Sequence, residues 1–316
     1  MDVLYIIIGV LVVLRGADRL TDGAVCVARR FNMPELIIGL TIVAFGTSMP
    51  ELCVSMASAL SGTSDMAVGN VVGSNIFNSL LIIGVCALIH PMSVSMTAIC
   101  RDLPFAFVAT LMLIFMLIDG TLSKGEGLVM LLVFASYMTY TLHTARKGGI
   151  EATETEPEHK QHKGILHIYD FSLFNIAIGL AELIIGSDVF VDHATLFAQA
   201  LGVSEAIIGI TILGAGTSLP EFATSVVAAL KGQTSMALGN VIGSCVFNIL
   251  MILGLTSVVV PLTPQGISTV DLATLFVAAM LLWFFSFTKN TMERWEGAVL
   301  TLGFVGYMGY LLSTCG

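Results

Sequence analysis

Two matching stretches of sequence decide the fold: G-L-T-I-V-A-F-G-T-S-M-P-E at residues 39–51 and G-I-T-I-L-G-A-G-T-S-L-P-E at residues 209–221. Comparison of each residue n with residue n+170 over positions 35–84 gives 27 identities in 50 positions. Self-similarity of this strength indicates an internal duplication. The match extends outward to Asp18 and Asp188, Asp22 and Asp192, Pro91 and Pro261, and Glu126 and Glu296. The two halves of the chain are copies of one another.

The composition around these stretches is that of a membrane protein. Charged residues make up 11% of the 316 residues and apolar residues 56%, with a mean hydropathy of +0.94. A soluble domain carries about 25% charged residues. This excludes a soluble enzyme, and the lack of a basic patch excludes a nucleic-acid-binding protein.

Apolar segments long enough to cross a bilayer as helices recur along the chain, since a span needs about 20 residues. We expect ten of them, five on each side of a polar loop at 143–165: 3–25, 36–60, 66–90, 103–118, 126–142, 170–194, 206–230, 236–260, 270–287 and 297–312. The sequence therefore predicts an all-α integral membrane protein with a first five-helix repeat at 1–142 and a second at 166–316.

Basic residues indicate the orientation of these spans. Ten Lys and Arg residues fall in the loops of one side, and Lys124 alone falls in the loops of the other. The positive-inside rule then predicts a multi-pass protein of the cell (inner) membrane, with both termini outside and the 143–165 loop cytoplasmic. Because five is odd, the second repeat has inverted topology, as in many secondary transporters.

Glu51 and Glu221 lie in the middle of their predicted spans. An ionisable side chain at this depth costs roughly 2.5–3.5 kcal/mol on insertion scales. No Lys or Arg lies in the central part of the second, third, seventh or eighth span. The counter-charge is therefore predicted to be a cation from outside the chain.

A proline precedes each glutamate and breaks its helix. Pro50 and Pro220 lack a backbone N–H and clash with the carbonyl four residues earlier, so the second and seventh helices are expected to unwind locally. Irregular backbone at membrane depth is tolerated only where it lines a cavity or is buried in protein. The neighbouring hydroxyl residues share the helix face of the glutamate: Thr47, Ser48, Thr217 and Ser218.

These oxygen groups are hard ligands that suit calcium or sodium. No His or Cys accompanies them, which argues against zinc or copper. The next spans add polar residues at four-residue intervals: Asn70, Ser74 and Asn78, and Asn240, Ser244 and Asn248. Such stripes either join helices by hydrogen bonds or complete an ion site. The second interpretation is favoured most for Ser74, Asn78, Ser244 and Asn248.

Charge counting suggests a mechanism. Two carboxylates balance one divalent cation, and an emptied site would carry two buried negative charges across the membrane. Obligatory exchange of calcium for sodium or protons follows. A passive cation channel remains an alternative, as does an intramembrane enzyme using both glutamates, although the P-loop and H-E-x-x-H signatures are absent.

The paired G-T-S-x-P-E and G-N-x-x-G-S-x-x-x-N segments resemble the two alpha-repeats of the calcium/cation antiporter superfamily. The ten-span layout resembles its bacterial and archaeal sodium/calcium exchangers. The resemblance implies that Glu51 and Glu221 coordinate calcium at the centre and that neighbouring residues complete adjoining sodium and calcium sites. These neighbours are Thr47, Ser48, Ser74, Asn78, Thr217, Ser218, Ser244 and Asn248.

The resemblance also implies a non-enzymatic secondary antiporter without a cofactor, whose partners are calcium, sodium and the lipid bilayer, with no nucleic acid and no obligate protein partner. The first and sixth spans would slide as a gating pair. Their aspartates either line the outer mouth or pair locally, as Asp18 would with Arg15 or Arg19.

Three positions separate this chain from some relatives. Asn248 stands where potassium-dependent members carry Asp, which makes potassium co-transport less favourable. Ser74 and Ser244 stand near an acidic residue of proton-coupled members, which favours sodium over protons. Asn75 corresponds to Cys245, so the two halves differ there.

Overall fold

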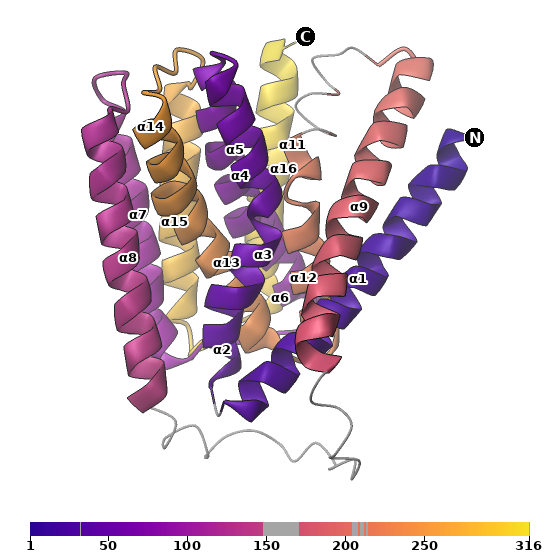
Figure 1. Cartoon of the computed structure of the whole chain (residues 1–316), viewed down its shortest axis with the longest axis vertical. Helices are drawn as coiled ribbons and strands as arrows, with labels where there is room; N and C mark the ends of the chain where they lie inside the picture. Colours follow the sequence, from indigo (N-terminus) through magenta and orange to yellow (C-terminus); the bar gives the residue numbers. More distant parts are fainter. Residues whose placement is uncertain (32, 148–170, 204–207, 209–211, 213, 316) are drawn as a thin grey trace.

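The structure is a computed structural model that describes residues 1–31, 33–147, 171–203, 208, 212 and 214–315. Most of the predicted loop at 143–165, and part of the repeated stretch at 209–221 (residues 209–211 and 213), lie outside the described residues. The described chain is helical except for two short strands (Figure 1). The fold is that of an all-α membrane protein.

The first half contains α-helices, π-helical turns (η) and one strand. In chain order these are α1 (Asp2–Arg30), α2 (Glu35–Ile38), η1 (Gly39–Val43), α3 (Ala44–Thr47), α4 (Met49–Leu60), α5 (Ser64–Ile76), η2 (Phe77–Ile82), α6 (Ile83–Ile89), β1 (Met92–Ser93), η3 (Ala98–Asp102), α7 (Leu103–Met116) and α8 (Lys124–Lys147).

The long helices of the second half follow the same order over its described residues, but its strand lies before the last helix. Its elements are α9 (Phe171–Ala200), α11 (Gly214–Gly216), α12 (Leu219–Leu230), α13 (Thr234–Val246), η5 (Phe247–Leu253), α14 (Gly254–Val259), α15 (Thr269–Ser286), β2 (Thr291–Met292) and α16 (Arg294–Cys315). The strands β1 and β2 pair antiparallel, with Met92 opposite Met292, and so join the connection before α7 in the first half to the connection before α16 in the second.

Seven helices in the described residues are long and apolar enough to cross a membrane. An eighth span results if the helix pair at 35–47 and 49–60, which bends by 44°, is counted as one. The bend falls at Ser48, two residues before Pro50, where the sequence predicted a break. Helix α1 is 29 residues long, but it carries Arg15, Asp18 and Arg19 within its apolar part and is not among the seven.

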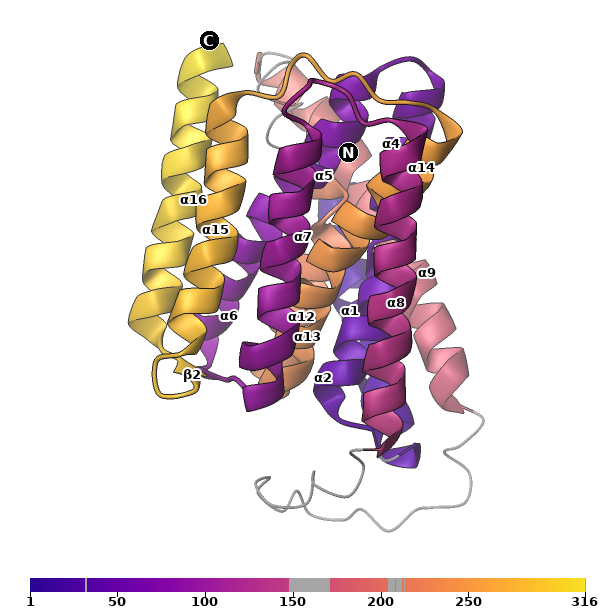
Figure 2. The same ribbon diagram turned by 90° about the vertical axis from the view of Figure 1, so that its left-hand side faces the viewer.

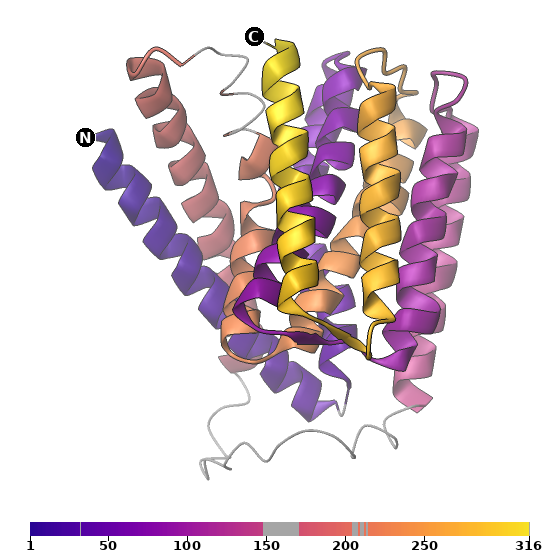
Figure 3. The same ribbon diagram turned by 180° about the vertical axis from the view of Figure 1, so that it is seen from behind.

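Two helices, each with a π-helical segment in its middle, form the centre of the molecule. In the continuous helix α5–η2–α6, 72% of the apolar window is buried, and in α13–η5–α14 the value is 83%, against 11% for α16. Helices α7, α8, α15 and α16 stand outside them (Figure 2). The end of α16 and the start of α1 lie at one end of the molecule, and the end of α8 and the start of α9 lie at the other (Figures 1 and 3).

Close glycine contacts join the two halves. Helix α1 lies antiparallel to α9, and a Cβ on Gly16 would lie 2.8 Å from the carbonyl oxygen of Gly179. The second contact of this kind is on α13, where a Cβ on Gly239 would collide with the carbonyl oxygen of Leu36 on α2. Helix α13 therefore packs directly against the broken helix of the first half and brings the two repeated motifs together.

Candidate functional site

Glu51 and Glu221 occupy equivalent places at the starts of α4 and α12. Each lies one residue after a proline in the first turn of its helix. A carboxylate at a helix N-terminus interacts favourably with the helix dipole. Both glutamates are 0% exposed, so the chain places two carboxyl groups in its interior.

Serine hydroxyls from the opposite half hold one oxygen of each carboxylate. Ser48 donates to Glu221 Oε1 at 2.9 Å, and Ser218 donates to Glu51 Oε1 at 2.9 Å. The contacts are exchanged between the halves, and both serines are 0% exposed. Ser48 and Ser218, both predicted from the sequence, therefore meet the glutamate of the other repeat rather than that of their own.

The second oxygen of each carboxylate has no partner. Glu51 Oε2 and Glu221 Oε2 are buried without a hydrogen bond, and no ion pair among the described residues includes either glutamate. Isolated buried carboxylates are costly unless they are paired or coordinate a metal. The geometry therefore agrees with the sequence argument that the compensating charge comes from outside the chain.

The threonines of the motifs bind asparagine side chains across the halves. Thr47 donates to Asn240 Oδ1 at 3.3 Å, and Thr217 donates to Asn70 Oδ1 at 3.2 Å. Asn70 and Asn240 also donate to the backbone carbonyls of Glu51 and Glu221, at 3.2 Å and 3.5 Å.

The two asparagines were left out of the predicted ligand set because their spacing also suits helix packing. In the structure they contact both repeated motifs, and the hydroxyls of Thr47 and Thr217 are already engaged. The four-residue period with Ser74 and Ser244 is the sequence signal that points to them.

The remaining predicted residues lie on α5, η2, α13 and η5, and all are at most 1% exposed: Ser74, Asn78, Ser244 and Asn248. The Ser74 and Ser218 hydroxyls are 2.9 Å apart, whereas Ser244 Oγ has no partner. Asn78 and Asn248 are each the second residue of a π-helical turn, a feature often found at functional sites.

Unpaired oxygens thus gather around the motifs of both halves: Glu51 Oε2, Glu221 Oε2, Asn78 Oδ1, Ser244 Oγ and Asn248 Oδ1. Carboxylate, amide and hydroxyl oxygens are typical ligands of Ca²⁺. In the part of the chain that the structure describes, no three His, Cys, Asp or Glu residues form a metal cluster. A cation here would be held by two carboxylates and neutral oxygens.

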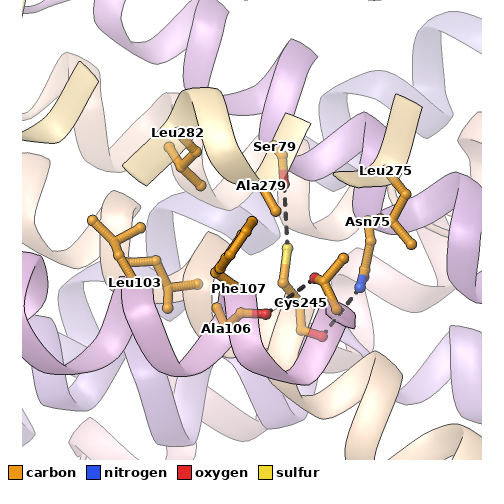
Figure 4. Close-up of a pocket in the computed structure, with 11 residues that line it drawn as sticks. Asn75, Ser79, Leu103, Ala106, Phe107, Cys245, Leu275, Ala279 and Leu282 are labelled. Carbon is orange, nitrogen blue, oxygen red and sulfur yellow. Dashed lines mark hydrogen bonds between the residues drawn. The ribbon is translucent and has the colours of Figure 1, made fainter. Parts of the chain in front are cut away.

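A small cavity lies beside this site (Figure 4). Its volume is about 10 Å³, and its polar lining residues are Asn75, Ser79, Thr110 and Cys245. The Ser79 hydroxyl lies 3.7 Å from the Cys245 thiol, and Asn75 donates to the Cys245 carbonyl. The position where the two repeats differ is therefore adjacent to the polar stripe.

Four charged residues of α1 pair with the second half rather than with one another: Arg15, Asp18, Arg19 and Asp22. Lys231, directly after α12, lies 2.6 Å from Asp18 and 2.7 Å from Asp22. Arg19 pairs with Glu182 on α9 at 2.7 Å. Of the two alternatives for Asp18, local pairing with Arg15 or Arg19 does not occur in this structure, because both arginines face Glu182 instead.

Comparisons with known proteins identify the relatives of this chain. The sequence profile of the sodium/calcium exchanger protein family matches residues 1–143 and 171–313. The chain is 35% identical over 319 residues to the putative antiporter CaxA of Alkalimonas amylolytica, covering 98% of each protein. It is 30% identical to the sodium/calcium exchanger MaX1 of Methanosarcina acetivorans, covering 96% of this chain and 97% of that one.

A solved structure agrees with these sequence matches. The sodium-calcium exchanger NCX_Mj, soaked with Na⁺ and Sr²⁺, superimposes with a TM-score of 0.84 at 29% identity, covering 98% of this chain and 97% of that one. The three comparisons therefore agree: each matches nearly the whole length of this chain to antiporter or exchanger proteins.

Proposed function

The chain belongs to the sodium/calcium exchanger family of the calcium/cation antiporter superfamily, and from this premise we propose that it exchanges calcium for sodium across the membrane by alternating access. The observation that carries the proposal is the pair of buried carboxylates. Each has one oxygen held by a serine of the other half and one oxygen without a partner.

The proposed ion site contains Glu51 and Glu221 as the calcium ligands. The adjoining sodium and calcium positions are completed by side-chain or backbone oxygens of Thr47, Ser48, Ser74, Asn78, Thr217, Ser218, Ser244 and Asn248. The burial of the four stripe residues and the unpaired oxygens of Asn78, Ser244 and Asn248 support this set. Because the hydroxyls of Thr47 and Thr217 bind asparagines, these two residues would contribute backbone oxygens.

The proposed architecture has ten transmembrane helices. Residues 1–142 form one five-helix repeat and residues 166–316 the inverted second, with broken second and seventh helices and the 143–165 loop between them. Both termini would lie outside and the loop would be cytoplasmic. The position of both chain ends at one end of the molecule supports this arrangement.

Exchange, rather than uniport, follows from the charge of the site. With both carboxylates ionised, the emptied site would carry two buried negative charges through the membrane interior, where uncompensated charge is expensive. A site filled by one calcium ion or by sodium ions avoids that cost. The empty carrier is therefore blocked from reorienting, which couples the two ion movements.

Uptake of calcium-45 into proteoliposomes tests the proposal. The vesicles are loaded with sodium, potassium or choline, or carry a proton gradient, at fixed external calcium. We expect uptake only with internal sodium. Uptake that is indifferent to the internal cation would indicate a channel, and uptake that needs only the proton gradient would indicate calcium/proton exchange.

A further inference from the structure

The two polar stripes carry the same residues, but directly beside them the first half has Asn75 where the second has Cys245. Both residues are buried, at 1% and 7% exposure, and both face the junction of the halves. An amide can donate and accept strong hydrogen bonds, whereas a thiol is weak in both roles. Asn75 can therefore fix the orientation of a neighbouring polar side chain by hydrogen bonds, whereas Cys245 can do so only weakly.

Asn75 makes two hydrogen bonds of opposite polarity. Its Nδ2 donates to the backbone carbonyl of Cys245 at 3.2 Å, and its Oδ1 accepts from Asn248 Nδ2 at 3.1 Å. A backbone carbonyl can only accept, so the Asn75 Nδ2 must face Cys245 and its Oδ1 must face Asn248. Asn248 must then turn its Nδ2 toward Asn75.

This fixed order determines where the remaining oxygen of Asn248 lies. The Nδ2 of Asn248 is used by Asn75, and its Oδ1 has no hydrogen-bond partner although the residue is 0% exposed. If the Asn248 amide were flipped by 180°, its Oδ1 would lie against the Oδ1 of Asn75, and two acceptors would face each other. Asn75 therefore keeps the Asn248 oxygen, rather than its NH₂ group, free to bind a cation.

The other half lacks such an arrangement. Asn78 corresponds to Asn248, and neither its Nδ2 nor its Oδ1 has a hydrogen-bond partner among the described residues. The residue at the position equivalent to Asn75 is Cys245, a weak hydrogen-bonding group, whose thiol lies 3.7 Å from the Ser79 hydroxyl and also faces Asn78. The cavity of about 10 Å³ at this place is near the lower limit for one water molecule.

We propose that Asn75 is a positioning residue that orients the Asn248 amide with its oxygen toward the transported cation, and that the site is consequently preorganised on the Asn248 side only. The proposal rests on the proposed function, because Asn248 belongs to the proposed ligand set. Asn75 itself touches no ion: it acts through Asn248.

The test compares Asn75→Ala with Cys245→Ala, which truncates the equivalent position and keeps the backbone carbonyl. The half-saturating concentrations of Ca²⁺ and Na⁺ and the maximal rate are measured in proteoliposomes. Loss of one buried hydrogen bond corresponds to about a 3- to 10-fold change. We expect Asn75→Ala to raise the half-saturating concentration of at least one ion by this factor, with a maximal rate within about twofold, and Cys245→Ala to change neither.

A double-mutant cycle separates positioning from general packing. In an Asn248→Ala background, Asn75→Ala is expected to have less than a twofold further effect, because the amide that it orients is gone. Equal effects of Asn75→Ala in both backgrounds, or unchanged half-saturating concentrations of both ions in Asn75→Ala itself, would overturn the proposal. If Asn75→Ala does not fold, Asn75→Cys takes its place, since the equivalent position already carries cysteine.

The outcome is independent of the coupling ion. If wild-type protein moves calcium with protons instead of sodium, the proposed coupling fails, but the half-saturating concentration of calcium still tests Asn75. If no transport is found, equilibrium binding of calcium-45 to the detergent-solubilised protein supplies the same comparison among the wild-type, Asn75→Ala and Cys245→Ala proteins.

Discussion

The two halves of the site agree at the carboxylates and differ farther out. Ser48 and Ser218 each donate to the glutamate of the opposite half at 2.9 Å. Away from this centre the repeats diverge: Asn75 corresponds to Cys245, and Ser61 corresponds to Lys231. Lys231 forms two ion pairs with α1, which a serine in the same place cannot form.

The comparison separates positions at which both halves make the same contact from positions at which only one half makes it. Contacts to the charged centre are exchanged across the junction, so a change in one half acts on the carboxylate of the other. The diverged positions Asn75 and Lys231 also contact the other half but do not bond to the carboxylates of Glu51 and Glu221, and there the repeats are free to differ. Substitutions made in equivalent pairs distinguish these two kinds of position.

The largest effect is expected for Glu51→Gln and Glu221→Gln. Each removes one of the two buried charges while keeping the side-chain size, and the remaining carboxylate cannot balance a divalent cation alone. We expect calcium uptake to fall by at least about 100-fold, or about 2.7 kcal/mol, in both variants. Asp119→Asn in an exposed turn is the control. A large loss in one variant only would break the equivalence of the halves.

Ser48→Ala and Ser218→Ala come next. Each removes a hydrogen bond to a carboxylate, and such bonds contribute about 1.5–3 kcal/mol. The half-saturating calcium concentration should rise about tenfold or more in both variants, within about threefold of each other. Ser61→Ala, which removes an exposed hydroxyl bonded to its own helix, should leave the concentration unchanged. A strong effect of Ser61→Ala would contradict the assignment.

Gly16→Ala and Gly186→Ala test the equivalence of α1 and α9. The new Cβ would lie 2.8 Å from the Gly179 oxygen in the first case and 2.9 Å from the Val13 backbone nitrogen in the second. Overpacking of this kind costs about 1–3 kcal/mol, which thermal unfolding in detergent would detect. Gly306→Ala, where no atom lies within 4 Å, is the control and should not destabilise the protein. Equal melting temperatures for all three variants would show that the helix pair is loosely packed.

The smallest effect is expected for Lys231→Ala. Burial alone would lower the pKa of Lys231, but hydrogen bonds and charges from Asp18 and Asp22 raise the pKa overall. The Lys231 ammonium group is therefore charged at neutral pH. The contribution is lost as the pH rises above the ordinary lysine range. Because both aspartates are more than half exposed, less than about 1 kcal/mol of stability is expected at low salt and less at high salt.

The reverse substitution, Ser61→Lys, sharpens the comparison. It places a lysine at the position equivalent to Lys231, in the half whose corresponding aspartates are Asp188 and Asp192. A gain in melting temperature equal to the loss in Lys231→Ala would mean that both ends pack alike. No gain would mean that the two ends of the molecule differ in structure.

The sequence predicted the centre of the site better than its surroundings. Glu51 and Glu221 were identifiable because a buried acid without a basic partner is conspicuous in an apolar segment, and Pro50 marked the bend at Ser48. The exchange of serine contacts between the halves was not predictable, because it depends on how α13 packs against α2 and η1. The same packing explains why the difference at Asn75 was noticed without a role.

Other features left weak signals or none. The π-helical turns that carry Asn78 and Asn248 have no sequence signature of their own. The strands β1 and β2 are two residues each and pair across 200 positions, which no local pattern indicates. Lys231 was counted only as a basic loop residue, since its partners on α1 are distant in the chain.

The glycines between α1 and α9 have a consequence for spectroscopic distances. They recur every seven residues on both helices, at Gly9 and Gly16 and at Gly179 and Gly186. If α1 slid along α9, its glycines would again face glycines of α9 only after a shift of seven residues, or about 10.5 Å. A smaller shift would push a side chain of one helix into the backbone of the other. Spin labels on α1 and α9 should therefore keep one separation in sodium and in calcium.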